Sequence, residues 1–314
     1  MRLVLGFDGG GTKTSCVLMN QNQVILAQSR SGPSNPLRVG IGQSLAAIQD
    51  AARQAATSAS VDIGQIKALC AGLAGVGEAD VCEKIRRLLA ESFPQAVAHV
   101  TTDLQIVLSA ASFATESGDG PIAVLLAGTG SAAIGRAKDG QILRVGGRGP
   151  LNGDEGSAYD VGRRALLAAD NIPTDGHSGL GEKILTELGV ASWADAQELS
   201  RSKPEEVYAR LFPVVASAAD SGDETAQDIL KAAANDLAAL TVTLIERLSL
   251  KGQEFSLVKS GGMMNRSHFF DAEIDQRLRL AAPKASITLL SMPPAEAAAR
   301  TALQLLQTSE AEEN

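Results

Sequence analysis

The chain has 314 residues and a net charge of −8 at pH 7, a size that suits two domains of roughly 150 residues each. An acidic balance without a basic patch argues against nucleic acid as a partner. No apolar run approaches the ~18 residues that span a bilayer, which argues against a membrane partner. The N-terminus enters a strand without a charged-then-apolar leader, and the three scattered cysteines are typical of reduced thiols. These features predict a cytoplasmic location.

The chain opens with an apolar strand at residues 3–7 that runs into a glycine-rich loop. The loop reads Asp8-Gly9-Gly10-Gly11-Thr12-Lys13-Thr14. Consecutive glycine N–H groups can form a nest for an anion, the threonines add hydroxyl donors, and Asp8 is placed to hold a hydrated magnesium. The P-loop and the dinucleotide fingerprint both require a helix after their glycines, whereas residues 16–19 are typical of a strand. A plain hairpin turn is the remaining alternative.

The same layout recurs in the middle of the chain. A second apolar strand, 122–127, leads into Gly128-Thr129-Gly130-Ser131, and a return strand, a turn and a third strand follow. Thr12 and Thr129 lie 117 positions apart, and Gln23 and Gln141, at the third strands, lie 118 apart. A shared strand–loop–strand–turn–strand order predicts two related domains that face each other.

Five motifs in fixed order resemble those of the actin-like ATPase superfamily, which includes sugar kinases, hexokinases, actin and Hsp70. The motifs are Asp8-Gly9-Gly10-Gly11-Thr12-Lys13-Thr14, Thr101-Thr102-Asp103, Ala127-Gly128-Thr129-Gly130-Ser131, Gly153-Asp154-Glu155-Gly156-Ser157 and Ser260-Gly261-Gly262. The branch that they resemble is the N-acetylglucosamine kinase and BadF/BadG/BcrA/BcrD-type ATPase family, over residues 3 to about 305. The resemblance implies an α/β fold of two ribonuclease-H-like domains around a cleft. The implied domains are 1–117, joined by a closing helix at 294–309, and 118–293 with a helical insertion.

ATP, Mg²⁺ and a sugar are the ligands that the resemblance implies, with Asp8 as the magnesium residue. It assigns ATP to the two glycine-rich loops and to an adenosine loop, at Gly10, Gly11, Thr12, Lys13, Thr14, Gly128, Thr129, Gly130, Ser131, Gly261, Gly262 and Asn265. For the adenosine loop, a simple turn between the strand at 255–258 and the following helix is the alternative. A homodimer is also implied.

Between the first two motifs, the sequence predicts a turn-rich loop at 31–36, a helix at 41–58, a strand at 66–70, a helix at 79–91 and a strand at 96–100. The small residues at 71–75 either leave room for a ligand or make a tight turn. Asn35 is a connector residue by its context alone, but the resemblance implies that its amide binds sugar hydroxyls. Asp103 is either the N-cap of a helix starting at Leu104 or, as the resemblance implies, the base that takes the proton from the attacking hydroxyl.

A polar, glycine-rich stretch at 116–120 predicts the boundary between the halves. Farther on, Asp154 and Glu155 precede a helix expected at 158–168, where acidic residues are favourable without any function. The resemblance instead implies that Gly147, Arg148 and Asp154 contact the sugar, and Asp154 is the rival of Asp103 as base. The vertebrate N-acetylglucosamine kinases of this family have a tryptophan at the position of Arg148. That guanidinium either pairs with the carboxylate of N-acetylmuramate or folds back onto Asp154 or Glu155.

The remainder is expected to be mainly helical from 173 to 250, with one long helix from 223 to 250 whose apolar stripe is core packing. Trp193 is interpreted as a packing residue. A strand at 286–290 and a helix at 294–306 complete the chain. In similar proteins this last helix crosses back onto the first domain.

The resemblance implies ATP-dependent phosphorylation of an amino sugar. The expected substrate is N-acetylglucosamine, phosphorylated at its 6-hydroxyl, and the alternatives are glucosamine and N-acetylmuramate. A reductase-activating ATPase would need a cysteine-held iron–sulfur cluster, which three scattered cysteines do not supply. A sugar-sensing regulator would need an added DNA-binding helix-turn-helix, and the chain begins at its first strand.

Overall fold

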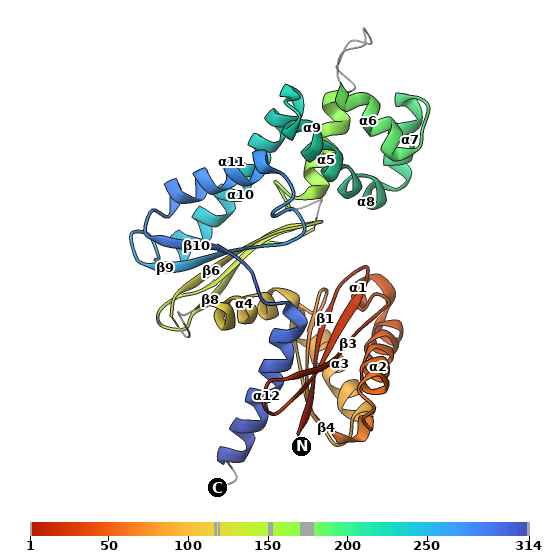
Figure 1. Ribbon diagram of the computed structural model, residues 1–314, viewed down its shortest axis with the longest axis vertical. Helices are drawn as coiled ribbons and strands as arrows, with labels where there is room; N and C mark the ends of the chain where they lie inside the picture. The colour runs from red at the N-terminus through yellow and green to blue at the C-terminus, as the bar shows by residue number, and fades with distance from the viewer. Residues whose placement is uncertain (1, 116–117, 119, 150–152, 170–178, 313–314) are drawn as a thin grey trace. The chain divides into compact units, whose positions relative to one another are not determined.

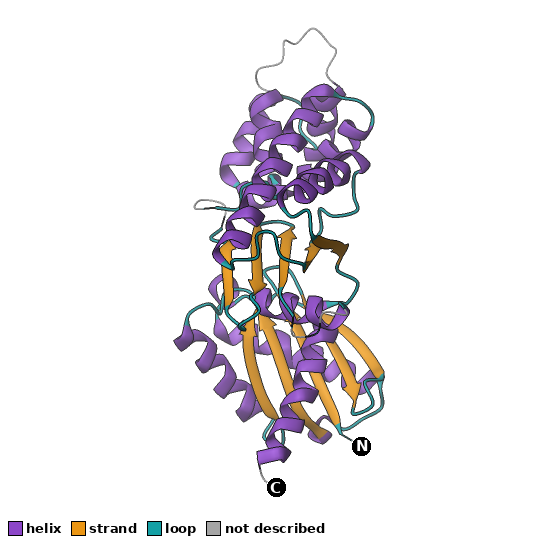
Figure 2. Ribbon diagram, turned by 90° about the vertical axis from the view of Figure 1, so that its left-hand side faces the viewer, coloured by secondary structure: helices purple, strands orange, loops and turns teal. Residues whose placement is uncertain are grey.

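The structure is a computed structural model that describes residues 2–115, 118, 120–149, 153–169 and 179–312, apart from the side chains of 169 and 308–312. The predicted boundary after residue 117 and the start of the segment at 173–250 lie outside the described residues. The chain folds as two compact units, Met1–Gly118 with Leu290–Asn314 and Asp119–Leu289. Each unit consists of one sheet flanked by helices (Figures 1 and 2).

The two sheets have the same topology. The first sheet has the order β3-β2-β1-β4-β5 and the second the order β8-β7-β6-β9-β10. In each, a central strand pairs antiparallel with the strand that follows it and parallel with a later one. The strands are β1 (Leu3–Gly9), β2 (Thr14–Asn20), β3 (Ile25–Ser31), β4 (Ile66–Leu73), β5 (Val97–Thr102), β6 (Ile122–Ala127), β7 (Ser131–Arg136), β8 (Ile142–Gly146), β9 (Phe255–Ser260) and β10 (Ala285–Leu289). The repeat in the sequence therefore corresponds to a repeated α/β fold, as predicted.

In the first unit, β1 is a central strand buried on both faces, which explains its continuous apolar run. Leu3, Leu5 and Phe7 pack with α2 (Ile41–Ser58) and α3 (Ala79–Ser92) on one face. Val4 packs on the other face with α4 (Asp103–Ala114) and α12 (Pro294–Glu312). The helix expected at 41–58 has those bounds, because its buried alanines and Ile48 recur at helical spacing.

The last helix, α12, covers one face of the first sheet and lies along β1, β4 and α4 (Figure 1). It approaches the strands closely because its buried side chains are small. These are Ala295, Ala297, Ala298, Ala299 and Ala302. At the point of closest approach β1 carries Gly6, where any Cβ would collide with backbone atoms of Ala295 and Ala299.

The second unit carries a helical insertion between β8 and β9. The helices of this unit are α5 (Ala158–Ala169), α6 (Gly179–Leu188), α7 (Trp193–Ser202), α8 (Pro204–Val207), α9 (Phe212–Asp220), α10 (Glu224–Arg247) and α11 (His268–Ala281). The buried stripe of α10 packs into the core as expected, and Trp193 packs against that core. Within the described ranges no helix is long and apolar enough to cross a bilayer.

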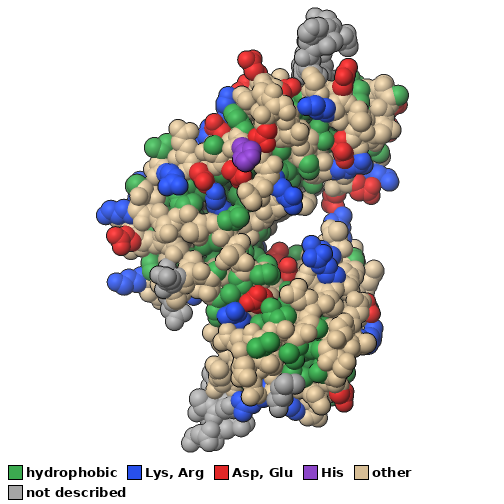
Figure 3. All heavy atoms as spheres, in the orientation of Figure 1, with side chains coloured by type: hydrophobic (Ala, Val, Ile, Leu, Met, Phe, Trp, Pro, Cys, Tyr) green, Lys and Arg blue, Asp and Glu red, His purple; other side chains and the backbone are tan. Residues whose placement is uncertain are grey.

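Charged side chains are spread over both units. On the face shown in Figure 3, Lys and Arg side chains alternate with Asp and Glu side chains and form no broad patch of one sign.

Candidate functional site

The first glycine-rich loop connects β1 to β2 and is fastened to the segment that follows β3. The Gly10 N–H donates to the carbonyl of Lys13 (3.0 Å), which closes the turn. The Gly10 carbonyl accepts from the N–H groups of Ser34 (3.0 Å) and Asn35 (3.1 Å). The predicted phosphate loop and the predicted sugar residue Asn35 are therefore parts of one hydrogen-bonded structure within the first unit.

Two of the hydroxyls predicted to bind phosphate are used inside the protein. Thr14 is fully buried, and its Oγ1 donates to the Gly32 carbonyl (2.7 Å). Ser131, at the same place in the second unit, is 3% exposed and donates to the Glu155 carbonyl (2.8 Å). A hydroxyl has one proton to donate, so this geometry argues against a phosphate role for both. By contrast, Thr12 and Thr129 are exposed at the tips of their loops.

Asp8 lies at the carboxyl end of β1, partly buried. Burial raises the pKa of this carboxyl to about 6, and the carboxylate of Asp103 contributes further, while Lys13 opposes the rise. The two carboxylates are thus close enough to repel each other electrostatically. A divalent cation bound through water would relieve that repulsion, so the residues fit the predicted magnesium site. Among the described residues, no cluster of three or more His, Cys, Asp or Glu side chains is arranged to hold a metal.

Asp103 is the first residue of α4 rather than its cap, so the N-cap alternative is wrong. Thr102 is the N-cap, and Thr102 and Gln105 form a reciprocal capping box. The Asp103 carboxylate accepts from the Leu104 N–H (2.9 Å). The carboxylate therefore lies in the first turn of α4, at the positive end of the helix dipole.

The ionised form of Asp8 should destabilise the ligand-free protein. Its folded-state pKa, about 6, exceeds the ordinary value of 3.8, so the folded state binds the proton more tightly than the unfolded state. The penalty therefore grows as pH rises from about 4 to about 6 and stays constant above that. We expect Asp8→Asn to raise the free energy of unfolding at pH 7.5 by about 1–2 kcal/mol, after discounting for solvent exposure.

Thermal melts of both proteins between pH 4 and pH 8, without nucleotide or metal, measure this effect. The difference should shrink toward pH 4. Asp50→Asn is the control, because Asp50 is a half-exposed residue of α2 that makes, among the described residues, only a 3.6 Å ion pair with Arg53 and a hydrogen bond from Gln54; its melting temperature should stay close to that of wild type at every pH. A destabilised Asp8→Asn protein at pH 7.5 would contradict the prediction.

Asn35 is the N-cap of the short helix α1 (Pro36–Val39), and its Oδ1 accepts from the Leu37 N–H (3.0 Å). Gly75, with φ of +84°, leaves room for this amide, because a Cβ there would collide with Oδ1. The cap fixes the orientation of the side chain, with the amide nitrogen as its donor and a second lone pair on Oδ1. Gly72 is a packing residue, since a Cβ there would collide with Ile106.

The second loop is fastened in the same way. The Gly128 carbonyl accepts from the Ala158 N–H at the start of α5 (2.9 Å), as the Gly10 carbonyl does from Asn35. Asp154 has φ of +63° and is 7% exposed. Its Oδ1 accepts from the Ser131 N–H (3.2 Å), and burial raises the pKa of its carboxyl. Asp154 therefore braces the second loop from within the second unit.

Gly147 and Arg148 follow β8 on an exposed stretch. The Gly147 N–H donates to the carbonyl of Ser131 (2.9 Å), which ties this stretch to the second loop. In the part of the chain that the structure describes, Arg148 makes no ion pair with Asp154 or Glu155. The alternative in which it folds back onto these carboxylates is therefore not seen.

The predicted adenosine loop lies directly against the second glycine-rich loop. Gly261 has φ of +109°, and a Cβ there would collide with the Ala127 backbone. The Ala127 carbonyl accepts from the Met263 N–H (3.1 Å). Asn265, at φ of +58°, is held by its N–H donating to Asp271 (3.1 Å). Gly262 has open space on its Cβ side.

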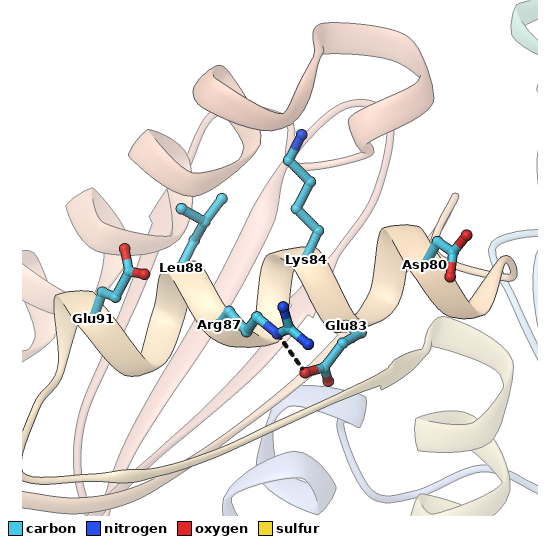
Figure 4. Close-up of a pocket in the computed structure, with 6 residues that line it drawn as sticks. All are labelled: Asp80, Glu83, Lys84, Arg87, Leu88 and Glu91. Carbon is cyan, nitrogen blue, oxygen red and sulfur yellow. Dashed lines mark hydrogen bonds and ion pairs between the residues drawn. The ribbon is translucent and has the colours of Figure 1, made fainter.

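A surface groove also runs along α3, as Figure 4 shows. Its lining comes from this one helix, at Asp80, Glu83, Lys84, Arg87, Leu88 and Glu91. Arg87 pairs with Glu83 across one turn (2.8 Å), a common arrangement on solvated helix faces. None of the predicted site residues lines the groove, so it is not part of the candidate site.

A model of the BadF/BadG/BcrA/BcrD ATPase family matches residues 5–298. The chain belongs to the BadF/BadG/BcrA/BcrD ATPase family. Among its relatives, an N-acetyl-D-glucosamine kinase of Dictyostelium discoideum is 32% identical, over 96% of this chain and 98% of that protein. An N-acetylmuramic acid/N-acetylglucosamine kinase of Clostridium acetobutylicum is 28% identical, over 91% and 94%. The crystal structure of a protein from Chromobacterium violaceum, titled a putative N-acetylglucosamine kinase, has a TM-score of 0.74 and 26% identity, over 98% and 99%.

The structure also shows residues near the loops of this family member that sequence reasoning missed. Arg38 lies over Gly11, and Asp271 holds Asn265. The N-cap of α4, Thr102, was missed as well, although the sequence carries a local signal for it: Thr102 and Gln105 have the spacing of a capping box. The other two contacts join segments that are not adjacent in the sequence.

Proposed function

We propose that this protein is an ATP-dependent kinase of an amino sugar, with N-acetylglucosamine as substrate and its 6-hydroxyl as acceptor. The observation that carries the proposal is the pair of interacting carboxylates Asp8 and Asp103 at the first glycine-rich loop, which is itself hydrogen-bonded to Asn35. Family membership and the names of the relatives support it. A phosphate loop, a carboxylate base and a sugar-binding amide are the components that such a reaction requires.

In the proposed reaction, Asp103 accepts the proton from the sugar hydroxyl. The hydroxyl oxygen then forms a bond to the γ-phosphorus, the bond from that phosphorus to the β,γ-bridging oxygen breaks, and ADP leaves. N–H groups of both loops and the hydroxyls of Thr12 and Thr129 bind phosphate oxygens, and Lys13 adds charge. Catalysis by positioning and electrostatics of this kind is typical of phosphoryl transfer.

Magnesium fits this proposal through Asp8, because burial and the nearby Asp103 carboxylate both raise the pKa of its carboxyl and a cation would stabilise the ionised form. When bound with the nucleotide, magnesium would neutralise charge on the phosphate oxygens. The adenosine loop at Gly261, Gly262 and Asn265 is proposed to contact the base and ribose. Its open side at Gly262 supports this role.

An assay of ADP release with N-acetylglucosamine, glucosamine and N-acetylmuramate tests the function, with phosphorus NMR to locate the new phosphate ester. We expect the highest kcat/KM with N-acetylglucosamine and a 6-phosphate product. ATP hydrolysis that no sugar accelerates would contradict the proposal and favour a reductase-activating ATPase. Against that second function, Cys16 and Cys70 are buried, and burial raises the pKa of each thiol to about 12, so neither is placed to bind a cluster at an exposed interface.

A homodimer and a cytoplasmic location complete the proposal. The first rests on the resemblance alone, and sedimentation velocity tests it. The second is supported by three free cysteines, which are typical of a reducing compartment.

The exposed and the buried hydroxyls of the two loops should behave differently. We expect Thr12→Ala and Thr129→Ala to raise the KM for ATP or lower kcat by about 10-fold or more, because a hydrogen bond to a charged group contributes about 1.5–3 kcal/mol. Sugar affinity measured without nucleotide should not change. Steady-state kinetics and calorimetry measure these quantities.

Thr14→Val and Ser131→Ala are the matched controls, since each removes a buried hydroxyl that bonds within its own unit. They should lower the melting temperature and leave the KM for ATP within about threefold. Equal effects of all four substitutions on sugar binding would mean that the loops only hold the fold together.

A further inference from the structure

Arg38 brings a second cation to the first glycine-rich loop, in addition to Lys13. A Cβ on Gly11 would stand 2.9 Å from a guanidinium nitrogen of Arg38 and 3.2 Å from its Cδ. The side chain of Arg38 therefore packs against the loop at Gly11. This close approach is possible because glycine has no Cβ. No motif pointed to Arg38, because the contact joins residues 27 positions apart.

Backbone hydrogen bonds fix the main chain of Arg38 next to the first glycine-rich loop. Asn35 caps α1, Pro36 follows at its first position with a restricted φ, and the Arg38 N–H donates to the Asn35 carbonyl (3.0 Å). The N–H groups of Ser34 and Asn35 in turn bind the Gly10 carbonyl. The Asn35 N–H bond to Gly10 and the Arg38 N–H bond to Asn35 thus connect the backbone of Arg38 to the loop.

The charges around the loop indicate what such a cation would do. Asp8 and Asp103 place two carboxylates beside the loop, and the positive charge of Lys13 partly offsets the negative charge of Asp8. Carboxylates of this kind repel a phosphoryl group, whose three equatorial oxygens carry spread negative charge during transfer. A planar guanidinium can bind two of those oxygens at once, which a lysine ammonium does less well.

We propose that Arg38 is a catalytic residue that binds the phosphoryl group as it passes from ATP to the sugar hydroxyl. This inference rests on the proposed kinase function and adds a residue to it. The guanidinium lies against the predicted phosphate loop at Gly11, and Arg38 is on the one-turn helix that the predicted sugar contact Asn35 caps. Arg38 changes no proton or bond count: Asp103 takes the proton, ADP leaves with the bridging oxygen, and Arg38 binds the oxygens of the group in transit.

The first measurement compares kcat and ADP affinity of Arg38→Ala, Arg38→Lys and wild type. Arginines that stabilise a phosphoryl group contribute large factors, about 10³–10⁵ in the strongest cases, so we expect Arg38→Ala to lower kcat by at least about 100-fold. ADP affinity should stay within about threefold, Arg38→Lys should recover only part of the activity, and added guanidinium ion should restore turnover to Arg38→Ala alone. Arg53→Ala is the control, since Arg53 is an exposed residue of α2 whose partner is Asp50 (3.6 Å).

The second measurement is the affinity of aluminium fluoride, a mimic of the group in transit, for the ADP–magnesium complex of each protein. It should be weakened at least about 100-fold by Arg38→Ala and unchanged by Arg53→Ala. This measurement needs no sugar substrate, so it tests the role of Arg38 even if wild type phosphorylates none of the sugars. That second result would contradict the proposed function alone.

Equal aluminium fluoride affinity in wild type and Arg38→Ala, or no binding by wild type, would overturn the role of Arg38. So would a kcat within threefold of wild type, or a loss confined to N-acetylmuramate, which would instead assign Arg38 to the carboxylate of that sugar.

Discussion

Asp103→Asn is expected to lower kcat by about 10²–10⁴-fold, the usual loss when a general base is removed. The asparagine side chain has nearly the same shape, and Thr102 and Gln105 still cap α4, so the fold should persist. The affinities for sugar and ATP should stay within a few fold, which separates a lost base from a lost binding residue. Single-turnover kinetics and calorimetry measure the two effects.

Asp154→Asn is the matched control for this experiment. Asp154 braces the second loop through the Ser131 N–H, and an asparagine oxygen can still accept that bond. We expect a rise of a few fold in the KM for ATP and a smaller change in kcat than for Asp103→Asn. If Asp103→Asn kept a near-normal kcat while Asp154→Asn was inactive, the two roles would be reversed.

Gly6→Ala is expected to destabilise the first unit by at least about 3 kcal/mol. The added Cβ would collide with main-chain atoms of Ala295 and Ala299, which cannot move aside as a flexible side chain can. Overpacking typically costs about 1–3 kcal/mol, and more where the backbone itself must shift. Denaturant unfolding should show a lower midpoint, or the variant should be recovered only as aggregate.

Gly42→Ala is the control, because Gly42 lies in α2 with open space on its Cβ side. Alanine is favoured over glycine in a helix by up to about 1 kcal/mol, so this variant should be equal to wild type or slightly more stable. A Gly6→Ala protein with unchanged stability would show that α12 does not approach β1 as described.

The parts of the fold that the sequence predicts well are those that repeat or alternate. The two glycine-rich loops have similar flanking strands, and the shared topology followed from that repeat. The helix at 41–58 has a clear apolar stripe. By contrast, β4 continues to Leu73, beyond the predicted end at residue 70, because its pairing with β5 extends that far. Pairing between distant segments is not visible in a single sequence.

The candidate site divides along the same line. The loops and carboxylates could be identified from their motifs. The sequence alone does not show which loop hydroxyls are exposed and which are buried in hydrogen bonds within the protein. Thr12 and Thr14 are similar in sequence, yet Thr14 begins β2 and turns its hydroxyl to Gly32. The cap of α4 was missed although the capping-box spacing was present. The contact of Arg38 with Gly11 depends on how the segment after β3 returns to the loop.

The place of α12 in the first unit also bears on how the protein forms during synthesis. β1 leaves the ribosome long before α12, because the helix that covers Val4, Val17 and Met19 begins only at Pro294. For most of translation the apolar face of the first sheet therefore has no α12 to cover it. A nascent chain in that state exposes surface that chaperones bind and that favours aggregation. The first unit thus completes its packing only after the second unit has been made, and a stop codon before residue 294 would damage the first unit although it leaves residues 1–118 intact.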